Sequence, residues 1–508
     1  FFGCGVEEPE LEESDEESKS NSSSIDPDGS GDGDSSTSLS ATILYELETN
    51  LSSTNSRRNQ NKTSSNSKTS ISTNLNSSQI SSIVEVARQG ILKKSLQANE
   101  NIGDLYPEIL QSALSHVGLL KLSSNETIKV ISAINWSLLK SSKSRTAKNQ
   151  RTNKNAIENI LTIISEKSFS NLDEAGLEIS NVASASGEII ATLIANLHHT
   201  DIDIHQLDSV LSQINASAVG SLDNIIGMDL DHLDKIIQSI TSKAIDRLDL
   251  IQVSGVELDN LTSIAGSITS GSIKALGYVT VSGFSIENVT SLSKSIVFSA
   301  ISMLDEINLP GYDSTVLEKM IQNISSSATS GLSQIYIEGY GVSQMALALE
   351  AVIEGATSSL DEIQGEASAT RSSSKVTNYG PEKLGSILEK ITASATEALG
   401  NIEMENFSAD NLTLLSEKII SGATSGINEI SMDGLSSGKV SDLLGKITEG
   451  MVSSIDDIKR EDYSKNQYRK MVRKVTKTMT HAITKLEIKG LTANTIKNMV
   501  RKITLGAT

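Results

Sequence analysis

The pattern of apolar and polar residues repeats with a period of about 28 residues over positions 216–508. A segment of the form Leu-x-x-Ile-x-Ile-x-Gly-Tyr recurs with variations, and two of its steps differ in length. The first step is short, and the step after Leu360 is long because it contains an insertion around Ala367–Val376. The recurring segments start at Leu222, Leu248, Leu276, Leu304, Leu332, Leu360, Leu399, Ile427, Ile455 and Ile483. So regular a period predicts a solenoid, in which each repeat packs on its neighbours.

One long helix is predicted in each repeat. Leu415, Ile419, Ala423, Ile427 and Ile430 follow one another at steps of four, four, four and three, which is one apolar stripe of an α-helix of about 20 residues. In six repeats a residue that favours the N-cap stands before the stripe, directly after an apolar residue. These predicted caps are Ser285, Asp313, Ser408, Ser436, Ser464 and Thr492. After the insertion, Pro381 is expected as the first helical residue.

The second half of each predicted helix is rich in small residues. Gly422 with Gly426, and Ser327 with Gly331, place two small side chains on one face, so that helix axes can approach closely. The segments between helices, such as Gln334–Gly339, alternate apolar and polar residues and look like strands. We favour an all-α repeat solenoid, in which each unit is one long helix plus a short extended linker. The alternative is an α/β horseshoe, because the Leu-x-x-Ile-x-Ile motif and the repeat length resemble those of leucine-rich repeats.

The N-terminal part of the body contains degenerate copies of the same plan. Residues 80–215 hold helical patterns at Ile83–Leu96, Ala113–Lys121, Ile128–Leu139, Ala156–Ile164 and Leu172–Leu197. The run Lys140–Asn155 has six basic residues and no acid, and we interpret it as an exposed loop. The predicted organisation is therefore degenerate helical repeats at 80–215, regular repeats at 216–458 and basic capping repeats at 459–508.

Composition narrows the range of functions. Hydrophobic residues make up 37% of the 508 residues and aromatic residues only 3%, so the core must be aliphatic. The net charge of −20 argues against a general nucleic-acid binder, because phosphates would be repelled. A single cysteine excludes an intrachain disulfide and a cysteine-rich zinc site. No Gly-rich phosphate loop, Gly-x-Ser-x-Gly or His-Glu-x-x-His motif is present, and we expect a protein that is not an enzyme.

Residues 5–79 are predicted to form a disordered tether. Positions 7–34 contain twelve acids and one lysine, and the rest is dominated by Ser, Asn, Thr and Asp. Burial cannot offset the entropy of ordering such a chain. One short apolar island, Ala41–Tyr45, is interpreted as a transient helix or a docking point.

The tether is preceded by Phe1-Phe2-Gly3-Cys4, which contains the only cysteine. This segment resembles the end of the lipobox of bacterial lipoproteins, in which small or apolar residues precede a cysteine that becomes lipidated. The resemblance implies that Cys4 carries a lipid anchor, and that Gly5 behind it directs the protein to the outer membrane. We therefore expect a lipid-anchored protein at the bacterial outer membrane or cell surface.

Two acidic segments are candidates for a metal ion. Asp26, Asp28, Ser30 and Asp32 match the first half of an EF-hand calcium loop, but Gly33 and Thr37 break its second half, and a solvated linker is preferred. In the second segment, alternating acids and histidines would share a face if extended, and a pair of acids recurs one repeat later. A polar edge is the preferred interpretation there, and a divalent-ion site is the alternative, with the residues His199, Asp201, Asp203, His205, Asp229 and Asp231.

The last fifty residues are basic, with thirteen Lys and Arg against three acids from Lys459 onward. A solvated cap, contact with an anionic polymer or lipid headgroup, and docking onto an acidic neighbour are all compatible with this charge. The candidate contact residues are Lys465, Arg469, Lys470, Arg473, Lys474, Lys477, Arg501 and Lys502.

The sequence as a whole predicts a surface-displayed lipoprotein that acts as a non-enzymatic scaffold in adhesion, envelope organisation or filament assembly. Its expected partners are a membrane, through the lipid anchor, and a protein or second copy, through the repeats. No cofactor, small-molecule substrate or specific nucleic acid is expected. The alternatives are a scaffold that binds nucleic acid or acidic glycan through its basic C-terminus, and a metal-dependent site at residues 199–234.

Overall fold

The computed structural model describes residues 39–52, 73, 75–95, 102–146, 155–200, 202–365, 381–404, 407–430, 436–458, 463–486 and 492–507. The chain divides into two units, Phe1–Ser38 and Leu39–Thr508, and all described residues lie in the second. The predicted lipidation site Cys4, the calcium-loop residues Asp26–Asp32 and the insertion at 367–376 lie outside the described residues.

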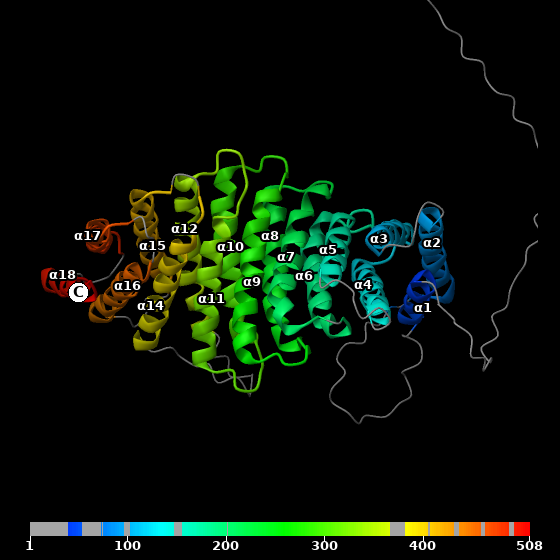
Figure 1. Ribbon diagram of the computed structural model, residues 1–508, viewed down its shortest axis with the longest axis horizontal. Helices are drawn as coiled ribbons and strands as arrows, with labels where there is room; N and C mark the ends of the chain where they lie inside the picture. The colour runs from blue at the N-terminus through cyan, green and yellow to red at the C-terminus, as the bar shows by residue number, and fades with distance from the viewer. Residues whose placement is uncertain are drawn as a thin grey trace, which may run out of the picture. The chain divides into compact units, whose positions relative to one another are not determined.

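The fold of the second unit is an all-α solenoid, as predicted. Each long helix packs most extensively on a helix of its own layer, which creates two layers (Figure 1). That partner is usually the next long helix but one in the chain, except at the N-terminal end, where α2 packs on α3 and α1 on α4. The first layer consists of α2 (Ser77–Ser95), α3 (Ile102–Leu119), α5 (Asn155–Ser170), α7 (Ile204–Gly220), α9 (Leu258–Ala275), α11 (Ser314–Leu332), α14 (Pro381–Ala398), α16 (Ser437–Asp457) and α18 (Ala493–Gly506). The second consists of α1 (Leu39–Ser52), α4 (Ser124–Thr146), α6 (Ile179–Ala195), α8 (Leu230–Asp246), α10 (Ile286–Ser302), α12 (Val342–Ser358), α15 (Ala409–Glu429) and α17 (Lys465–Ala482).

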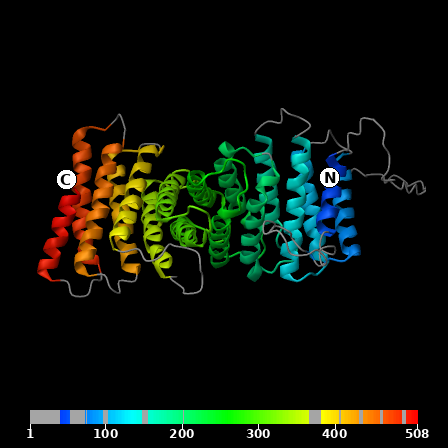
Figure 2. The ribbon, with the colours of Figure 1, turned by 90° about the horizontal axis from the view of Figure 1, so that it is seen from below.

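The pair of layers turns along the stack. At one end, α15 lies above α14 and α16 in Figure 1, whereas at the other end the first-layer helices α3 and α5 lie above α4. Figure 2 shows the helices standing side by side, with their connections at both edges of the stack. Such gradual turning is typical of α-solenoids.

Helix starts agree with the sequence prediction. Ser285, Asp313, Ser408, Ser436, Ser464 and Thr492 are all N-caps. The Asp313 carboxylate, for example, accepts hydrogen bonds from the backbone N–H groups of Thr315 and Val316. Pro381 opens α14, where its missing N–H costs no hydrogen bond.

The predicted apolar stripe forms the core between the layers. Leu415, Ile419, Ala423 and Ile427 of α15 are fully buried, and Ile430 behind them is almost so. The leucine or isoleucine that starts each repeat segment is also buried, as at Leu248. In most repeats this residue begins the short 3₁₀ turn that ends the helix. These turns are η2 (Leu197–His199), η3 (Leu222–Asn224), η4 (Leu248–Leu250), η5 (Leu276–Tyr278), η6 (Leu304–Glu306), η7 (Leu399–Asn401) and η8 (Ile483–Lys485).

The linkers do not form the strands that their alternation suggests. Among the described residues there is no strand. After η3, η4, η5 and η6 only a short extended stretch separates the 3₁₀ turn from a glycine turn. Gly283, at φ +82°, reverses the chain ahead of α10 in the left-handed region that favours glycine. Glycines at equivalent linker positions share this conformation, namely Gly227, Gly255, Gly311 and Gly339. The α/β horseshoe is therefore excluded for the described repeats.

Small residues bring same-layer helices into backbone contact, as predicted. A Cβ added to Gly422 of α15 would lie 2.2 Å from the backbone oxygen of Glu350 in α12. A Cβ on Gly271 of α9 would lie equally close to the backbone oxygen of Ser212 in α7. Because no side chain separates the helices at these points, the layers pack tightly with few aromatic residues.

Two boundaries at the N-terminal side differ from the sequence interpretation. Leu39–Ser52, placed in the tether, is helix α1, and its Leu47 and Leu51 are buried against the body, where Asn50 donates a hydrogen bond to Ser137 of α4. The run from Lys140, interpreted as a loop, begins as helix, because α4 continues to Thr146. Lys140 Nζ lies 2.8 Å from Glu46 Oε2, so the two differences are linked by one ion pair between α4 and α1.

Candidate functional site at the basic C-terminal end

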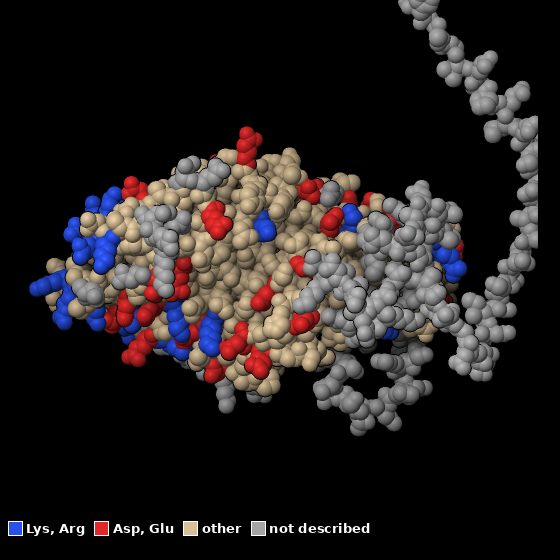
Figure 3. Space-filling view, viewed as in Figure 1, with Lys and Arg blue, Asp and Glu red and all other residues tan. Residues whose placement is uncertain are grey.

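The last two helices carry only positive charge. α17 contains six Lys and Arg residues, α18 contains three, and neither contains Asp or Glu. Met471, Val475 and Met479 of α17 and Met499 and Ile503 of α18 are buried on the core side. The bases therefore occupy the remaining faces, and Figure 3 shows them gathered at this end of the stack.

Three of the eight predicted contact residues pair with the helix before them in the same layer. In α17, Lys470 Nζ lies 2.8 Å from Asp410 Oδ1, which lowers the pKa of that carboxyl through a direct hydrogen bond. Lys474 Nζ lies 3.2 Å from Glu417 Oε1, also in α15. In α18, Lys502 Nζ lies 2.8 Å from Asp442 Oδ1 of α16. These lysines are part of the packing of the solenoid.

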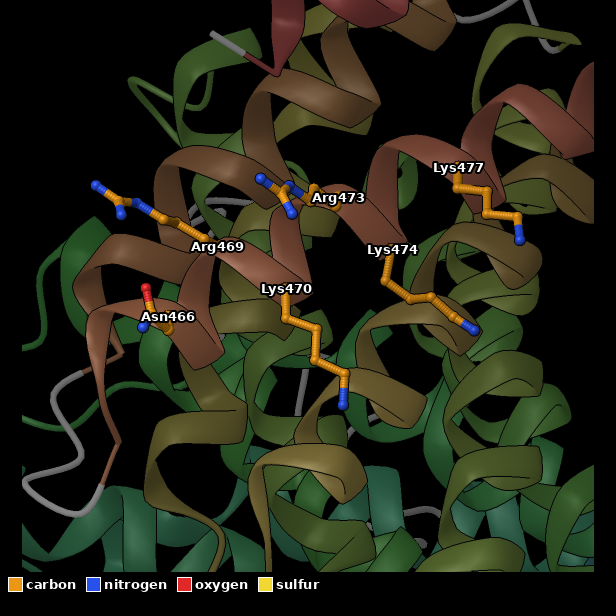
Figure 4. Close-up of a pocket in the computed structure, with 6 residues that line it drawn as sticks. All are labelled: Asn466, Arg469, Lys470, Arg473, Lys474 and Lys477. Carbon is orange, nitrogen blue, oxygen red and sulfur yellow. The ribbon is translucent and has the colours of Figure 1, made fainter.

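The other five predicted residues form no ion pair with any described residue. Lys465, Arg469, Arg473 and Lys477 of α17 and Arg501 of α18 are exposed. In Figure 4, the side chains of Arg469 and Arg473 extend from α17 in a different direction from those of Lys470 and Lys474. The helix borders a shallow hollow of about 390 Å³, lined by Asn466, Arg469, Lys470, Arg473, Lys474 and Lys477.

A regularly spaced series of lysines, which we call the lysine ladder, explains why some of these bases form ion pairs and others do not. One lysine recurs once in each repeat through the last five long helices, at Lys390, Lys418, Lys446, Lys474 and Lys502. Each lies beside an acid of the preceding helix in its own layer: Glu318, Glu350, Glu389, Glu417 and Asp442 respectively. The Nζ–carboxylate distance is 2.5 Å at Lys418 and 3.0 Å at Lys446.

The residue directly before each ladder lysine faces the next helix of the same layer and sets the charge at that contact. Glu389 precedes Lys390 and pairs forward with Lys446, and Glu417 precedes Lys418 and pairs forward with Lys474. This acid position is Gly445 in α16, and it is Arg473 in α17 and Arg501 in α18. The sign of the forward-facing charge is therefore reversed in the last two helices.

Lys294 of α10 is an exception, because the ladder lysines pair with the preceding helix of their layer and Lys294 pairs with later helices. It pairs forward, with Nζ 2.7 Å from Glu354 Oε1 of α12 and 2.9 Å from Glu429 Oε1 of α15. Burial raises the pKa of Glu354. The group ties three second-layer helices together and has no unpaired member that would serve an external ligand.

The acids of the candidate metal segment cap helices. Asp203 is the N-cap of α7 and accepts a hydrogen bond from the backbone N–H of His205. Asp229 is the N-cap of α8, and the backbone N–H of His232 lowers its pKa, helped by the His232 ring nitrogen at 2.6 Å. Asp201 and the side chain of His199 lie outside the described residues.

The sequence alignment of these acids was wrong because one repeat is short. Asp203, which follows Asp201 by two positions, is the equivalent of Asp229, since both are the N-caps of their helices. Asp231 falls inside the first turn of α8. Among the described residues no group of three His, Cys, Asp or Glu side chains is arranged to hold a metal ion.

A second uncovered surface lies along one edge of the stack. Ile226, Tyr278 and Tyr336 are 81%, 52% and 75% exposed, and each stands in the linker that follows a first-layer helix. These linkers are neighbours, since a Cβ on Gly220 would lie 3.6 Å from Tyr278 Cβ and one on Gly277 would lie 2.9 Å from Tyr336 N. We call these three residues the apolar edge.

The sequence interpretation missed the acids of the ladder and the apolar edge. Glu350, Glu389 and Glu417 were visible only as members of an acidic body, although the regular spacing of the ladder lysines is plain once the repeats are aligned. None of the described helices is both long enough and apolar enough to cross a membrane. In comparisons with known proteins, no protein-family model matches the chain, and no curated protein matches it.

Proposed function

We propose that the protein is a non-enzymatic interaction scaffold, displayed at the bacterial cell surface by a lipid on Cys4. The resemblance of Phe1–Cys4 to a lipobox supports the location. The stack of like helices supports the scaffold, because solenoids present extended surfaces for binding.

The observation that carries the proposal is the apolar edge. Ile226, Tyr278 and Tyr336 are large apolar side chains that the fold sets on neighbouring linkers and leaves exposed. Exposed apolar residues that gather on one surface, rather than singly, mark sites of protein contact. Tyrosine in particular is favoured at such contacts because its ring buries a large area and its hydroxyl stays hydrated.

The test is site-specific photo-crosslinking in cells that express the full-length gene. A crosslinking amino acid replaces Ile226 or Tyr336, one at a time, and a matched control replaces Lys129, which is exposed on α4. Both edge positions should give the same discrete protein adduct, and Lys129 should not. The absence of an adduct at both edge positions would contradict the scaffold proposal.

The location is tested separately, by the Cys4→Ala variant of the same gene. The wild-type protein should partition with membranes and its N-terminal peptide should carry the mass of an acyl group, whereas the variant should be released. Equal partitioning of the two proteins would exclude the lipid anchor, and it would leave the proposed scaffold function unaffected.

A further inference from the structure

We propose that the outer face of α17 binds an α-helix of a partner protein that carries Asp or Glu at the positions where α17 carries Lys470 and Lys474. This inference rests on the proposed scaffold function and names the class of partner for one surface. The occupant would lie where the ladder places the next helix of the second layer.

The equivalent positions of successive repeats show which charged side chains that helix must have. α17 docks on α15 by placing Lys470 and Lys474 opposite Asp410 and Glu417. The residues of α17 at the positions equivalent to this acidic pair, two repeats further on, are Asn466 and Arg473. A helix that brought ladder lysines to this face would meet Arg473, and two like charges in contact repel. A helix with Asp or Glu in place of those lysines would be attracted.

The side chains around Arg473 strengthen this preference. Arg469 and Lys477 are exposed on α17 one helical turn before and after it, and the hollow of about 390 Å³ runs along the same helix. The guanidinium groups of two arginines can each bind a carboxylate through two parallel hydrogen bonds, which favours discrete carboxylates over a diffuse negative charge.

Nucleic acid fits this face less well. A phosphate backbone needs positive charge along several turns of duplex or an extended groove. Here the bases end at α17 and α18, and Figure 3 shows Asp and Glu side chains next to them. The whole chain carries a net charge of −20, so a long polyanion would be repelled beyond the terminal helices.

The probe is a peptide with the α17 sequence, Lys465–Ala482, in which Lys470 and Lys474 are both replaced by glutamate. Its controls are the unaltered α17 peptide and a scrambled peptide with the composition of the probe. Binding to the full chain is measured by fluorescence anisotropy at low ionic strength, with peptide helicity followed by circular dichroism.

The probe should bind at least tenfold more tightly than the scrambled peptide, and the unaltered peptide should not bind. The Arg469→Glu/Arg473→Glu variant should lose this binding, because both residues are exposed and the core face of α17 is unchanged. The matched control is Lys129→Glu/Lys235→Glu, which makes the same change in net charge on α4 and α8 and should bind normally.

Equal affinity for the probe and the scrambled peptide, or binding unaffected by the arginine variant, would overturn the inference. A single-stranded DNA oligonucleotide that bound more tightly than the probe at the same salt concentration would also overturn it, in favour of nucleic acid. Crosslinking at Ile226 and Tyr336 is independent of α17, so it separates a failure here from a failure of the scaffold function.

Discussion

Gly422 of α15 lies so close to Glu350 of α12 that a Cβ on the glycine would stand 2.2 Å from the backbone oxygen of the glutamate. The relationship recurs elsewhere in the stack, for example between Gly450 of α16 and Glu389 of α14, where the distance would be 2.3 Å. In each case the glutamate that supplies the carbonyl also supplies the carboxylate for a ladder lysine. One residue therefore sets both the spacing and the charge pairing of two helices.

Gly422→Ala should destabilise the solenoid by about 1–3 kcal/mol, because the added methyl group must push two backbones apart. The control is Gly438→Ala in the first turn of α16, where the nearest atom to an added Cβ is 3.8 Å away. Since alanine favours helix more than glycine does, the control should be neutral or slightly stabilising. Urea unfolding of both variants measures the difference. Equal midpoints for the two variants would contradict the close approach of α12 and α15.

Gly283→Ala should destabilise the turn before α10 by about 1–2 kcal/mol. At φ +82° the cost is backbone strain alone, since no atom lies within 4 Å of an added Cβ. Gly283→Asn is the matched comparison, because asparagine tolerates left-handed backbone better, and it should lose less stability. A larger loss for asparagine than for alanine, measured by thermal unfolding, would exclude strain as the cause.

Glu318 makes stability depend on pH. Its carboxylate is almost fully buried in α11 beside Lys383 and Lys390 of α14. Burial acts to raise its pKa, but the hydrogen bonds from the two lysines outweigh burial, and the pKa is lowered from the usual 4.5. A carboxyl whose folded pKa is depressed stabilises the fold above its unfolded pKa, and this stabilisation is lost as the pH falls through the folded pKa.

Glu318→Gln should therefore cost about 1.5 kcal/mol at pH 7, the size of a hydrogen bond to a charged group. Relative to wild type this loss should shrink as the pH falls below 4.5, because wild type then loses the same interaction. Amide hydrogen exchange of α11 and α14, compared between the variant and wild type at pH 7 and pH 3, measures this loss of stability. Glu382→Gln, on the exposed side of α14, should have little effect at either pH.

Local signals in the sequence were enough to predict the helices. Contacts between segments far apart in the chain could not be predicted from such signals. Ser408 and Asp313 could be predicted as helix starts because capping depends on atoms within one turn of the chain. The linker Gln334–Gly339 alternates like a strand, but a strand also needs a partner, which the alternation cannot show. The basic C-terminus was recognised as a charged surface, yet the separation of Lys474 from Arg473 required knowing that helices two apart in the chain are neighbours.

The short repeat before α8 illustrates a second limit. A period assumed to be constant placed Asp229 opposite Asp201, whereas the N-caps show that Asp203 is the equivalent residue. A shift of two positions in a helical repeat changes which side chain caps and which faces solvent. Repeat alignments made on caps are therefore safer than alignments made on length.

Charge at the acid position should control whether the next helix docks. Glu417→Arg places an arginine where α17 has Arg473 and α18 has Arg501, so that it faces Lys474 across the α15–α17 contact. Repulsion between the two bases should loosen α17, and its amide hydrogens should exchange faster, while helices such as α9 at a distance should be unaffected. High salt should reduce the effect.

The charge swap Glu417→Arg/Lys474→Glu should restore slow exchange in α17, because it recreates an ion pair in the opposite sense. Recovery would show that sign, rather than the identity of glutamate, governs docking at this position. It would also reproduce inside the chain the pairing proposed for the outer face of α17, where an arginine is already present and the acid must come from the partner. Loosening that persists in the double variant would instead indicate that Glu417 acts through packing, as would equal exchange in Glu417→Arg and wild type.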